Sequence, residues 1–216
     1  MTSAFSKDIA NAKAALASLP CDWEGKKSVL ALKEANYNWR QMEWWAFFFE
    51  YLCRERLANT FQMPGERIGS VTFDLKGCVN WDMKAKAIKS DSHKCILNDR
   101  SSTDASIKTH GAHGVMIALC DVEYNDVNRT FQTWHSELKG GPSAYETERR
   151  TRTAVSRYRK THAVLTEILF LRLDKHSVRR MGEMKQGRNS NGKQRPLKYM
   201  LDLEDVDGLL VDRLSF

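Results

Sequence analysis

The chain has 216 residues, of which 42% are hydrophobic and 28% are charged, a balance typical of one globular domain with a substantial buried core. Its sequence shows no apolar run of the roughly 18 residues that a membrane span needs and no N-terminal signal-peptide pattern. The five cysteines form no C-x-x-C pair, which disfavours a zinc site and predicts reduced thiols. We therefore expect a cytoplasmic protein of a single domain, residues 1–216, without a membrane partner.

The positive charge is concentrated in one stretch of the chain. The net charge is +7, yet residues 1–138 are balanced, with 17 basic and 17 acidic side chains. Residues 139–198 carry 16 basic and 5 acidic side chains, a balance of +11, whereas residues 199–216 carry 1 and 5, a balance of −4. A basic stretch of this kind is typical of a surface that meets nucleic-acid phosphates. The alternative is a solvated basic face without a partner.

Three helices are predicted in the first 60 residues. Residues 3–19 are rich in alanine and end at Pro20, so we expect a helix that packs or makes a subunit contact. Residues 26–36 form a second, short helix. Residues 38–59 form a long helix that is aromatic around most of its circumference, which predicts that it lies deep in the core.

Two acidic residues interrupt the aromatic surface of this third helix. Glu43 and Glu50 are seven residues apart, which places them two turns apart on one face. A carboxylate among many aromatic rings costs several kcal/mol unless it pairs with a cation or a metal. Arg40 and Arg54 lie near enough along the helix for an ordinary ion pair, so a structural role and a functional role are both open.

A hairpin over residues 70–88 is the feature around which we expect the chain to be organised. Residues 71–75 and 79–88 are predicted as strands, joined by a tight connection at Lys76-Gly77-Cys78. Successive strand side chains point to opposite faces, so Asp82, Lys84 and Lys86 share one face.

Asp74 comes from the neighbouring strand of this hairpin and would join Asp82 and Lys84 on the same side. Two carboxylates and a lysine then converge, and this combination is suited to a divalent cation and an activated water. The alternative is a set of solvated pairs on the outer face of a two-stranded ribbon.

Helices and strands alternate through the rest of the chain. We expect a short helix and loop over residues 89–112, a buried central strand over 115–122, a helix over 125–139 and a helix or structured loop over 143–160. We then expect a strand or helix over 163–173, a mobile basic loop over 179–198, and a closing strand and helix over 199–216. The pair His110 and His113 has no third ligand placed beside it, so a loop with two histidines is the favoured interpretation.

The hairpin motif resembles the core of the PD-(D/E)xK nuclease superfamily, to which most type II restriction endonucleases belong. Phe73-Asp74 and Asp82-Met83-Lys84 carry the resemblance, with Phe73 in the place of the signature proline. It covers roughly residues 40–125. The resemblance implies that Asp74 and Asp82 bind Mg²⁺ and that Lys84 orients the attacking water or helps to deprotonate it. It further implies one more acid from the preceding helix, for which Glu50 is favoured over Glu43.

One ambiguity of register remains within the motif. Asp74-Leu75-Lys76 is itself a D-x-K, so Lys76 is an alternative to Lys84 as the motif lysine. Lys84 lies inside the predicted strand, whereas Lys76 leads into a glycine turn where a side chain is less firmly held. We therefore favour Lys84.

Together these patterns predict an α/β fold with a central mixed sheet flanked by helices, and the resemblance makes it restriction-endonuclease-like. The implied function is a Mg²⁺-dependent type II restriction endonuclease of a restriction-modification system, a homodimer that acts on double-stranded DNA. A repair or recombination nuclease without sequence specificity and a catalytically inactive DNA-binding module are the alternatives. The residues predicted to contact DNA are Arg157, Arg159, Lys160, Arg188, Asn189, Lys193 and Arg195.

Overall fold

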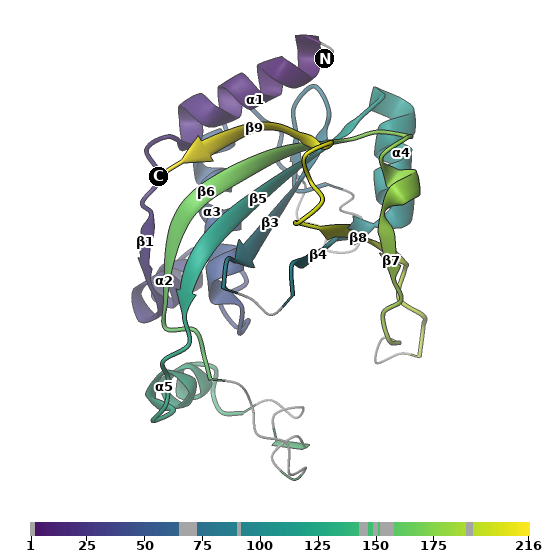
Figure 1. Ribbon diagram of the computed structural model, residues 1–216. Helices are drawn as coiled ribbons and strands as arrows, with labels where there is room; N and C mark the ends of the chain where they lie inside the picture. The colour runs from purple at the N-terminus through teal and green to yellow at the C-terminus, as the bar shows by residue number, and fades with distance from the viewer. Residues whose placement is uncertain are drawn as a thin grey trace.

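A curled mixed sheet forms the centre of the fold in the computed structural model, which describes residues 3–64, 73–89, 92–142, 147–148, 151, 158–188 and 192–216. The expected mixed α/β class is confirmed (Figure 1). Its helices are α1 Ser3–Leu16, α2 Gly25–Glu34, α3 Trp44–Leu57, α4 Arg100–His110, α5 Thr130–Leu138 and the 3₁₀ helix η1 Val178–Arg180. Its strands are β1 Asp22–Glu24, β2 Leu75–Lys76, β3 Asn80–Ala87, β4 Lys94–Asp99, β5 His113–Glu123, β6 His162–Leu173, β7 Gly182–Met184, β8 Lys198–Asp202 and β9 Leu210–Ser215.

The central sheet has the strand order β1-β6-β5-β3-β2, and β9 also pairs with β6. β3 and β5 run parallel, and the connection between them passes through β4 and α4. The other pairings of this sheet are antiparallel. β4, β8 and β7 form a second, three-stranded sheet. The predicted buried strands over residues 115–122 and 163–173 are thus confirmed as β5 and β6.

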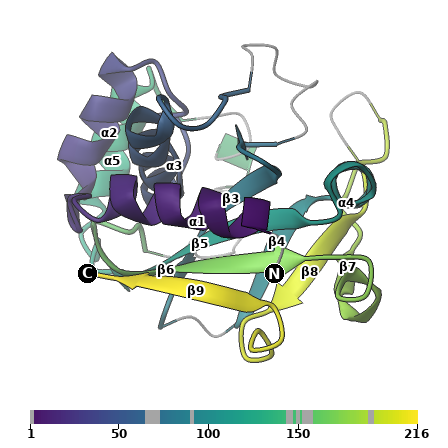
Figure 2. The same cartoon turned by 90° about the horizontal axis from the view of Figure 1, so that it is seen from above.

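Each face of the central sheet has its own apolar core because the strand side chains alternate. Met116 and Ala118 of β5 belong to the core beneath α1 and α3, whereas Val115 and Ile117 face the second sheet and α4. Figure 2 shows α1, α2 and α3 on one side of the sheet, with β7, β8 and α4 grouped away from them. β3 follows the same alternation, so Trp81 and Met83 face the helices. Asp82 and Lys84 therefore face the second sheet.

A buried carboxylate of α1 holds the turn between β2 and β3. Asp8 is 3% exposed and accepts hydrogen bonds from the backbone nitrogens of Cys78 at 2.9 Å and Val79 at 3.2 Å, and from Trp81 Nε1 at 2.9 Å. A Cβ added at Gly77 would lie 2.5 Å from an Asp8 oxygen, so only glycine fits there. The sequence indicated no such role for this helix.

Several expectations about the elements were wrong. The connection of the hairpin falls at residues 77–79, so Lys76 belongs to β2 and not to the turn. Residues 71 and 72 of the predicted first strand lie outside the described residues, so that part of the prediction is untested. The polar stretch 89–112 contains the expected helix as α4, but a strand, β4, precedes it. The closing segment contains two strands instead of a strand and a helix. Both differences arise from pairing between distant segments, which local pattern does not reveal: β4 pairs with β8 about a hundred residues later, and β9 pairs with β6.

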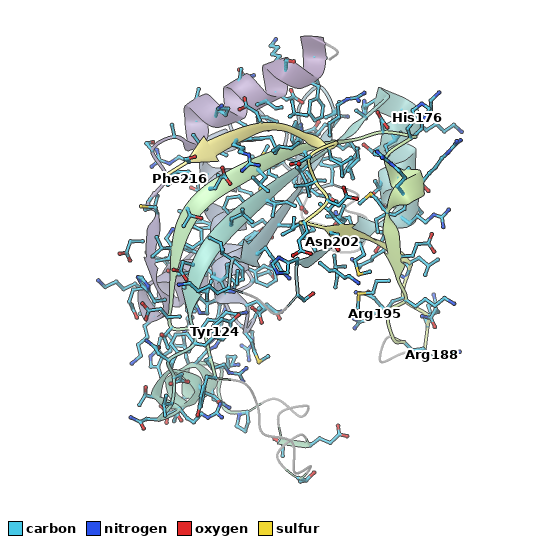
Figure 3. All side chains as sticks on the ribbon, viewed as in Figure 1. Tyr124, His176, Arg188, Arg195, Asp202 and Phe216 are labelled. Carbon is cyan, nitrogen blue, oxygen red and sulfur yellow. The ribbon has the colours of Figure 1, made fainter. Side chains whose placement is uncertain are left out.

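The basic segment 139–198 is not one continuous surface. β6 passes through its middle and is buried in the core, because apolar residues occupy most of its positions. Residues 179–198 do not form a simple mobile loop, since η1, β7 and the start of β8 lie within them. The described residues between β7 and β8 extend from the body of the fold as a basic arm, residues 185–188 and 192–197, on which Figure 3 labels Arg188 and Arg195.

The contacts of Asp8 predict a large loss of stability in the Asp8→Ala variant. Three buried or half-buried donors would lose their acceptor, and we expect the free energy of unfolding to fall by about 3 kcal/mol. Urea denaturation of the two proteins measures this difference. Lys7→Ala on the exposed side of the same helix is the control and should change stability by less than about 0.5 kcal/mol. Equal stabilities of the two variants would show that Asp8 does not hold the hairpin.

Candidate active site

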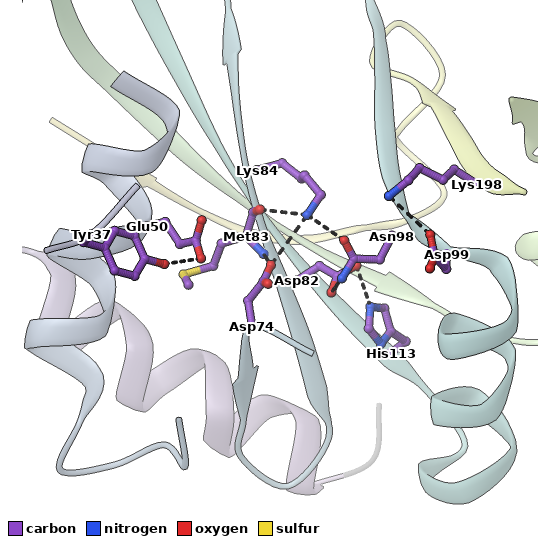
Figure 4. Close-up of polar contacts among 10 residues, drawn as sticks. All are labelled: Tyr37, Glu50, Asp74, Asp82, Met83, Lys84, Asn98, Asp99, His113 and Lys198. Carbon is purple, nitrogen blue, oxygen red and sulfur yellow. Dashed lines mark hydrogen bonds and ion pairs between the residues drawn. The ribbon is translucent and has the colours of Figure 1, made fainter. Parts of the chain in front are cut away.

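The hairpin brings the motif residues together as the alternation predicted. Leu75 pairs with Trp81, a register that places Asp74 opposite Asp82. Asp74 Oδ2 accepts a hydrogen bond from the backbone nitrogen of Met83 at 2.7 Å and lies 3.5 Å from Lys84 Nζ. Figure 4 shows the two acids and the lysine converging at β3. Lys76 has no ion pair with either acid among the described contacts, so Lys84 is the lysine that the structure places at the cluster.

Asp82 is the most enclosed member of this cluster, with no exposed surface. Its Oδ1 accepts a hydrogen bond from Asn98 Nδ2, and its Oδ2 lies 3.3 Å from His113 Nε2 without the alignment of a hydrogen bond. The other ring nitrogen of His113 lies 3.1 Å from Ser106 Oγ. Burial alone would raise the pKa of Asp82, but the charge of Lys84 and the neighbouring His113 ring bring the pKa below its usual range. Asp82 is therefore an ionised carboxylate.

Lys84 is held by neighbours on several sides. Its Nζ donates to the Met83 carbonyl oxygen at 2.9 Å and to Asn98 Oδ1 at 3.1 Å, in addition to the ion pair with Asp74. Burial would lower the pKa of this amine, but Asp74, Asp82 and Glu50 together raise the pKa above its usual range. Lys84 is therefore a cation at neutral pH. It can donate hydrogen bonds to a water or phosphate, and it is not suited to accept a proton.

Of the two helix acids, Glu50 lies beside the cluster. Its Oε1 accepts a hydrogen bond from the Tyr37 hydroxyl, and Figure 4 shows it on the α3 side of Asp74. Burial, and then the negative charge of Asp74, raise the pKa of Glu50 to about 7. The pKa of Asp74 is raised as well, chiefly by burial and further by Asp82, against the opposing effect of Lys84. Burial is the main cause of both shifts, and mutual repulsion of the carboxylates adds to it, so a bound cation would lower both pKa values.

The donor chemistry of this cluster fits Mg²⁺. Asp74 and Asp82 offer carboxylate oxygens, and Asp82 Oδ2 is buried without a hydrogen-bond partner in the described structure. Mg²⁺ is usually held by one or two carboxylates and keeps several waters, so two acids are sufficient. Within the described ranges, no three histidine, cysteine or acidic side chains form a ready-made metal cage. The arrangement is thus a two-carboxylate site with Glu50 as a nearby third acid.

Glu43 was predicted at the active site and Lys160 at the DNA surface, and in the structure the two side chains form an ion pair with each other. Lys160 Nζ forms an ion pair with Glu43 Oε2, and Trp45 Nε1 donates to the same oxygen at 3.1 Å. The Lys160 side chain is only 12% exposed and lies over the rings of Trp45 and Tyr124. Burial lowers its pKa to about 8. Glu43 precedes the first residue of α3, about two turns from Glu50, and its carboxylate is bound by Lys160 and Trp45 and not by the cluster.

The other predicted DNA contacts lie at two places. Arg188, Lys193 and Arg195 belong to the basic arm, where Arg188 Nη1 donates to the Gly192 carbonyl oxygen at 3.0 Å. Arg159 lies near Met42 at the other side of the fold, where its guanidinium contacts the Met42 sulfur. Arg157 and Asn189 lie outside the described residues, so their predicted role is unchanged.

Four residues of the cluster were not predicted from the sequence. They are Tyr37, Asn98, Ser106 and His113. His113 was interpreted as part of a loop, whereas it is the first residue of β5 and is 1% exposed. A histidine two residues before the apolar run of a central strand is the one signal that could have indicated its burial.

Comparison of the chain with known protein families, with curated proteins and with solved structures gives no match. None of the helices in the described part of the chain has the length and apolar character that crossing a bilayer requires.

The raised pKa of Glu50 predicts that stability depends on pH. A carboxyl with a folded-state pKa above its ordinary value of 4.5 contributes fully to stability below that value, and the contribution is lost as the pH rises through about 7. From pH 4 to pH 8 we expect the parent to lose up to about 3 kcal/mol of unfolding free energy that Glu50→Gln retains. Urea denaturation over this pH range, without divalent cations, measures the difference.

Glu55→Gln, an exposed change on the same helix, is the control for this measurement and should follow the parent curve. If Glu50→Gln also follows the parent curve at every pH, the carboxyl of Glu50 does not carry the raised pKa.

Proposed function

We propose that this protein is a Mg²⁺-dependent nuclease of double-stranded DNA with a restriction-endonuclease-like fold, most specifically a type II restriction endonuclease. The observation that carries the proposal is the convergence of Asp74, Asp82 and Lys84 on one face of a hairpin, beside Glu50 from the preceding helix. This is the arrangement that the PD-(D/E)xK resemblance implies. Two acids, one cationic lysine and a basic surface are the parts that metal-assisted phosphodiester hydrolysis requires.

In the proposed reaction each residue has a separate role. Asp74 and Asp82 hold the cation, and Glu50 adds negative charge on the α3 side. Bound Mg²⁺ supplies Lewis-acid stabilisation of the negative charge that develops on the phosphate as the 3′ oxygen leaves. Lys84 is fixed as an ammonium group, so it orients the attacking water and a phosphate oxygen by donating hydrogen bonds to them.

The distribution of positive charge supports DNA as the substrate. The chain carries +7 overall, and the arm that holds Arg188 and Arg195 extends from the sheet that packs over the Asp82 face. Phosphate contacts from such an arm would position a duplex without reading its sequence. A homodimer would place two such sites on a short palindrome, which is the usual arrangement for this class of enzyme.

Digestion of linear phage DNA with and without Mg²⁺ tests the proposal, with Asp82→Asn as the inactive control. Discrete bands support a restriction enzyme, a smear supports a nuclease without sequence specificity, and no cleavage by the parent contradicts nuclease activity. We expect Asp82→Asn to retain the fold and DNA binding, because it removes one charge at almost constant volume. Cleavage by this variant at more than about a tenth of the parent rate would contradict the metal-binding role of Asp82.

Substitution of the two candidate lysines, Lys84 and Lys76, should have different effects on cleavage. Lys84→Ala should reduce the single-turnover cleavage rate by about 10²- to 10⁴-fold, because the variant loses the cation that contacts Asp74 and Asn98. Lys76→Ala is the matched control and should lose much less. Both rates are measured at saturating enzyme, with DNA binding measured separately in Ca²⁺. An inactive Lys76→Ala together with an active Lys84→Ala would assign the motif to Asp74-Leu75-Lys76 instead.

A further inference from the structure

Asn98 reaches the candidate active site from the second sheet. It lies near the end of β4, where the pairing of β4 with β8 is regular from Lys94 to Ile96 and then shifts before Asp99. Such a bulge changes the direction of the side chains within it, and bulges occur preferentially beside active sites. Leu97, in the same irregular stretch, is buried in the core between the sheets. Asn98 is thereby directed at β3 of the central sheet (Figure 4).

Both ends of the Asn98 amide are used at the site. Its nitrogen donates to Asp82 Oδ1, and its oxygen accepts from Lys84 Nζ at 3.1 Å. A neutral amide can bond a carboxylate and an ammonium group at once because it has a donor end and an acceptor end. Among the described ion pairs, Lys84 is joined to Asp74 but not to Asp82. The amide of Asn98 therefore stands where a direct ion pair between Lys84 and Asp82 would otherwise form.

The backbone around Asn98 is fixed on the side away from the site. The next residue, Asp99, forms an ion pair with Lys198 of β8 at 3.3 Å, and the backbone nitrogen of Arg100 donates to the Leu197 carbonyl oxygen at 2.9 Å. These contacts hold the end of β4 against the start of β8. Asn98 can accordingly impose a position on Asp82 and Lys84 instead of following their movements.

We propose that Asn98 is a positioning residue that keeps the Lys84 ammonium group apart from the Asp82 carboxylate. Asp82 then remains available to a cation, and Lys84 stays directed towards Asp74. This inference rests on the proposed nuclease function for its consequence in catalysis, although the positioning itself concerns only residues of this chain. Without the amide, the opposite charges of Lys84 and Asp82 would pair directly, and the ammonium group would compete with Mg²⁺ for the carboxylate.

The positioning can be tested without metal or substrate. Lysine ammonium groups that are held by hydrogen bonds exchange their protons slowly, so we expect a resolved ¹⁵Nζ NMR signal for Lys84, assigned by its loss in Lys84→Arg. Asn98→Leu keeps the branched shape and the number of heavy side-chain atoms and removes both hydrogen bonds, so the Lys84 signal should shift or vanish. Ile96→Val is the matched control, an exposed change on the same strand, and should leave that signal in place. An unchanged Lys84 signal in Asn98→Leu would overturn the inference.

The functional consequence is tested on the same variants. In Asn98→Leu we expect Mg²⁺ affinity, measured by calorimetry, and the single-turnover cleavage rate each to fall about 10- to 100-fold. DNA affinity in Ca²⁺ should change by less than about threefold, because the duplex contacts lie elsewhere. Asn98→Ala, which also removes both hydrogen bonds and adds no volume, should change in the same direction and replaces Asn98→Leu if that variant does not fold.

The outcomes separate this inference from the proposed function. A parent protein that cleaves DNA, with an Asn98→Leu variant that binds Mg²⁺ and cleaves equally well, would overturn the role of Asn98 and leave the nuclease intact. A parent protein that neither binds Mg²⁺ nor cleaves would overturn the nuclease. In that case the NMR comparison still decides whether Asn98 positions Lys84.

Discussion

The hydrogen bonds from the β2–β3 turn to Asp8 are the constraint on which the rest of the site depends. Two backbone nitrogens and the Trp81 indole donate hydrogen bonds to one buried carboxylate. These bonds fix the position of the turn relative to α1. Trp81 then stacks on Phe5, with ring centroids 4.8 Å apart, and lies over Gly114, where a Cβ would come within 2.2 Å of its ring. The register of the hairpin, and hence the opposition of its two acids, follows from these contacts.

The electrostatics of the cluster are asymmetric. Asp82 lies between Asn98 and His113 and is ionised, whereas burial favours the protonated forms of Asp74 and Glu50. Asp82 is thus prepared to bind a cation, and positive charge near Asp74 and Glu50 would lower their raised pKa values. In the proposed enzyme, metal binding would therefore be coupled to proton release from the α3 side of the site.

The local sequence pattern was sufficient to predict that the hairpin brings Asp82 and Lys84 to one face. It was insufficient to predict which residues from other elements surround them. The alternation of Trp81 and Met83 with Asp82 and Lys84 predicted both the strand and the shared face, because strand periodicity is a property of neighbouring residues. Asn98 could not be predicted, because its direction depends on a bulge in a pairing with β8, about a hundred residues later. The choice between Glu50 and Glu43 depended likewise on tertiary contacts, since Lys160 lies 117 residues from its partner Glu43.

The second sheet connects the arm that is proposed to bind DNA with the residues that are proposed to carry out the chemistry. β8 begins where the basic arm ends, and it pairs with β4, which carries Asn98. Strands joined by a ladder of hydrogen bonds move together more readily than they slide, because sliding breaks several bonds at once. If the arm binds phosphates and β8 is displaced, β4 would therefore move with it. The position of Asn98 relative to Asp82 and Lys84 would then change. The bulge in β4 lies at Asn98, the residue through which the second sheet contacts the site. Bulges often redirect a side chain beside an active site, and this one directs Asn98 at Asp82 and Lys84.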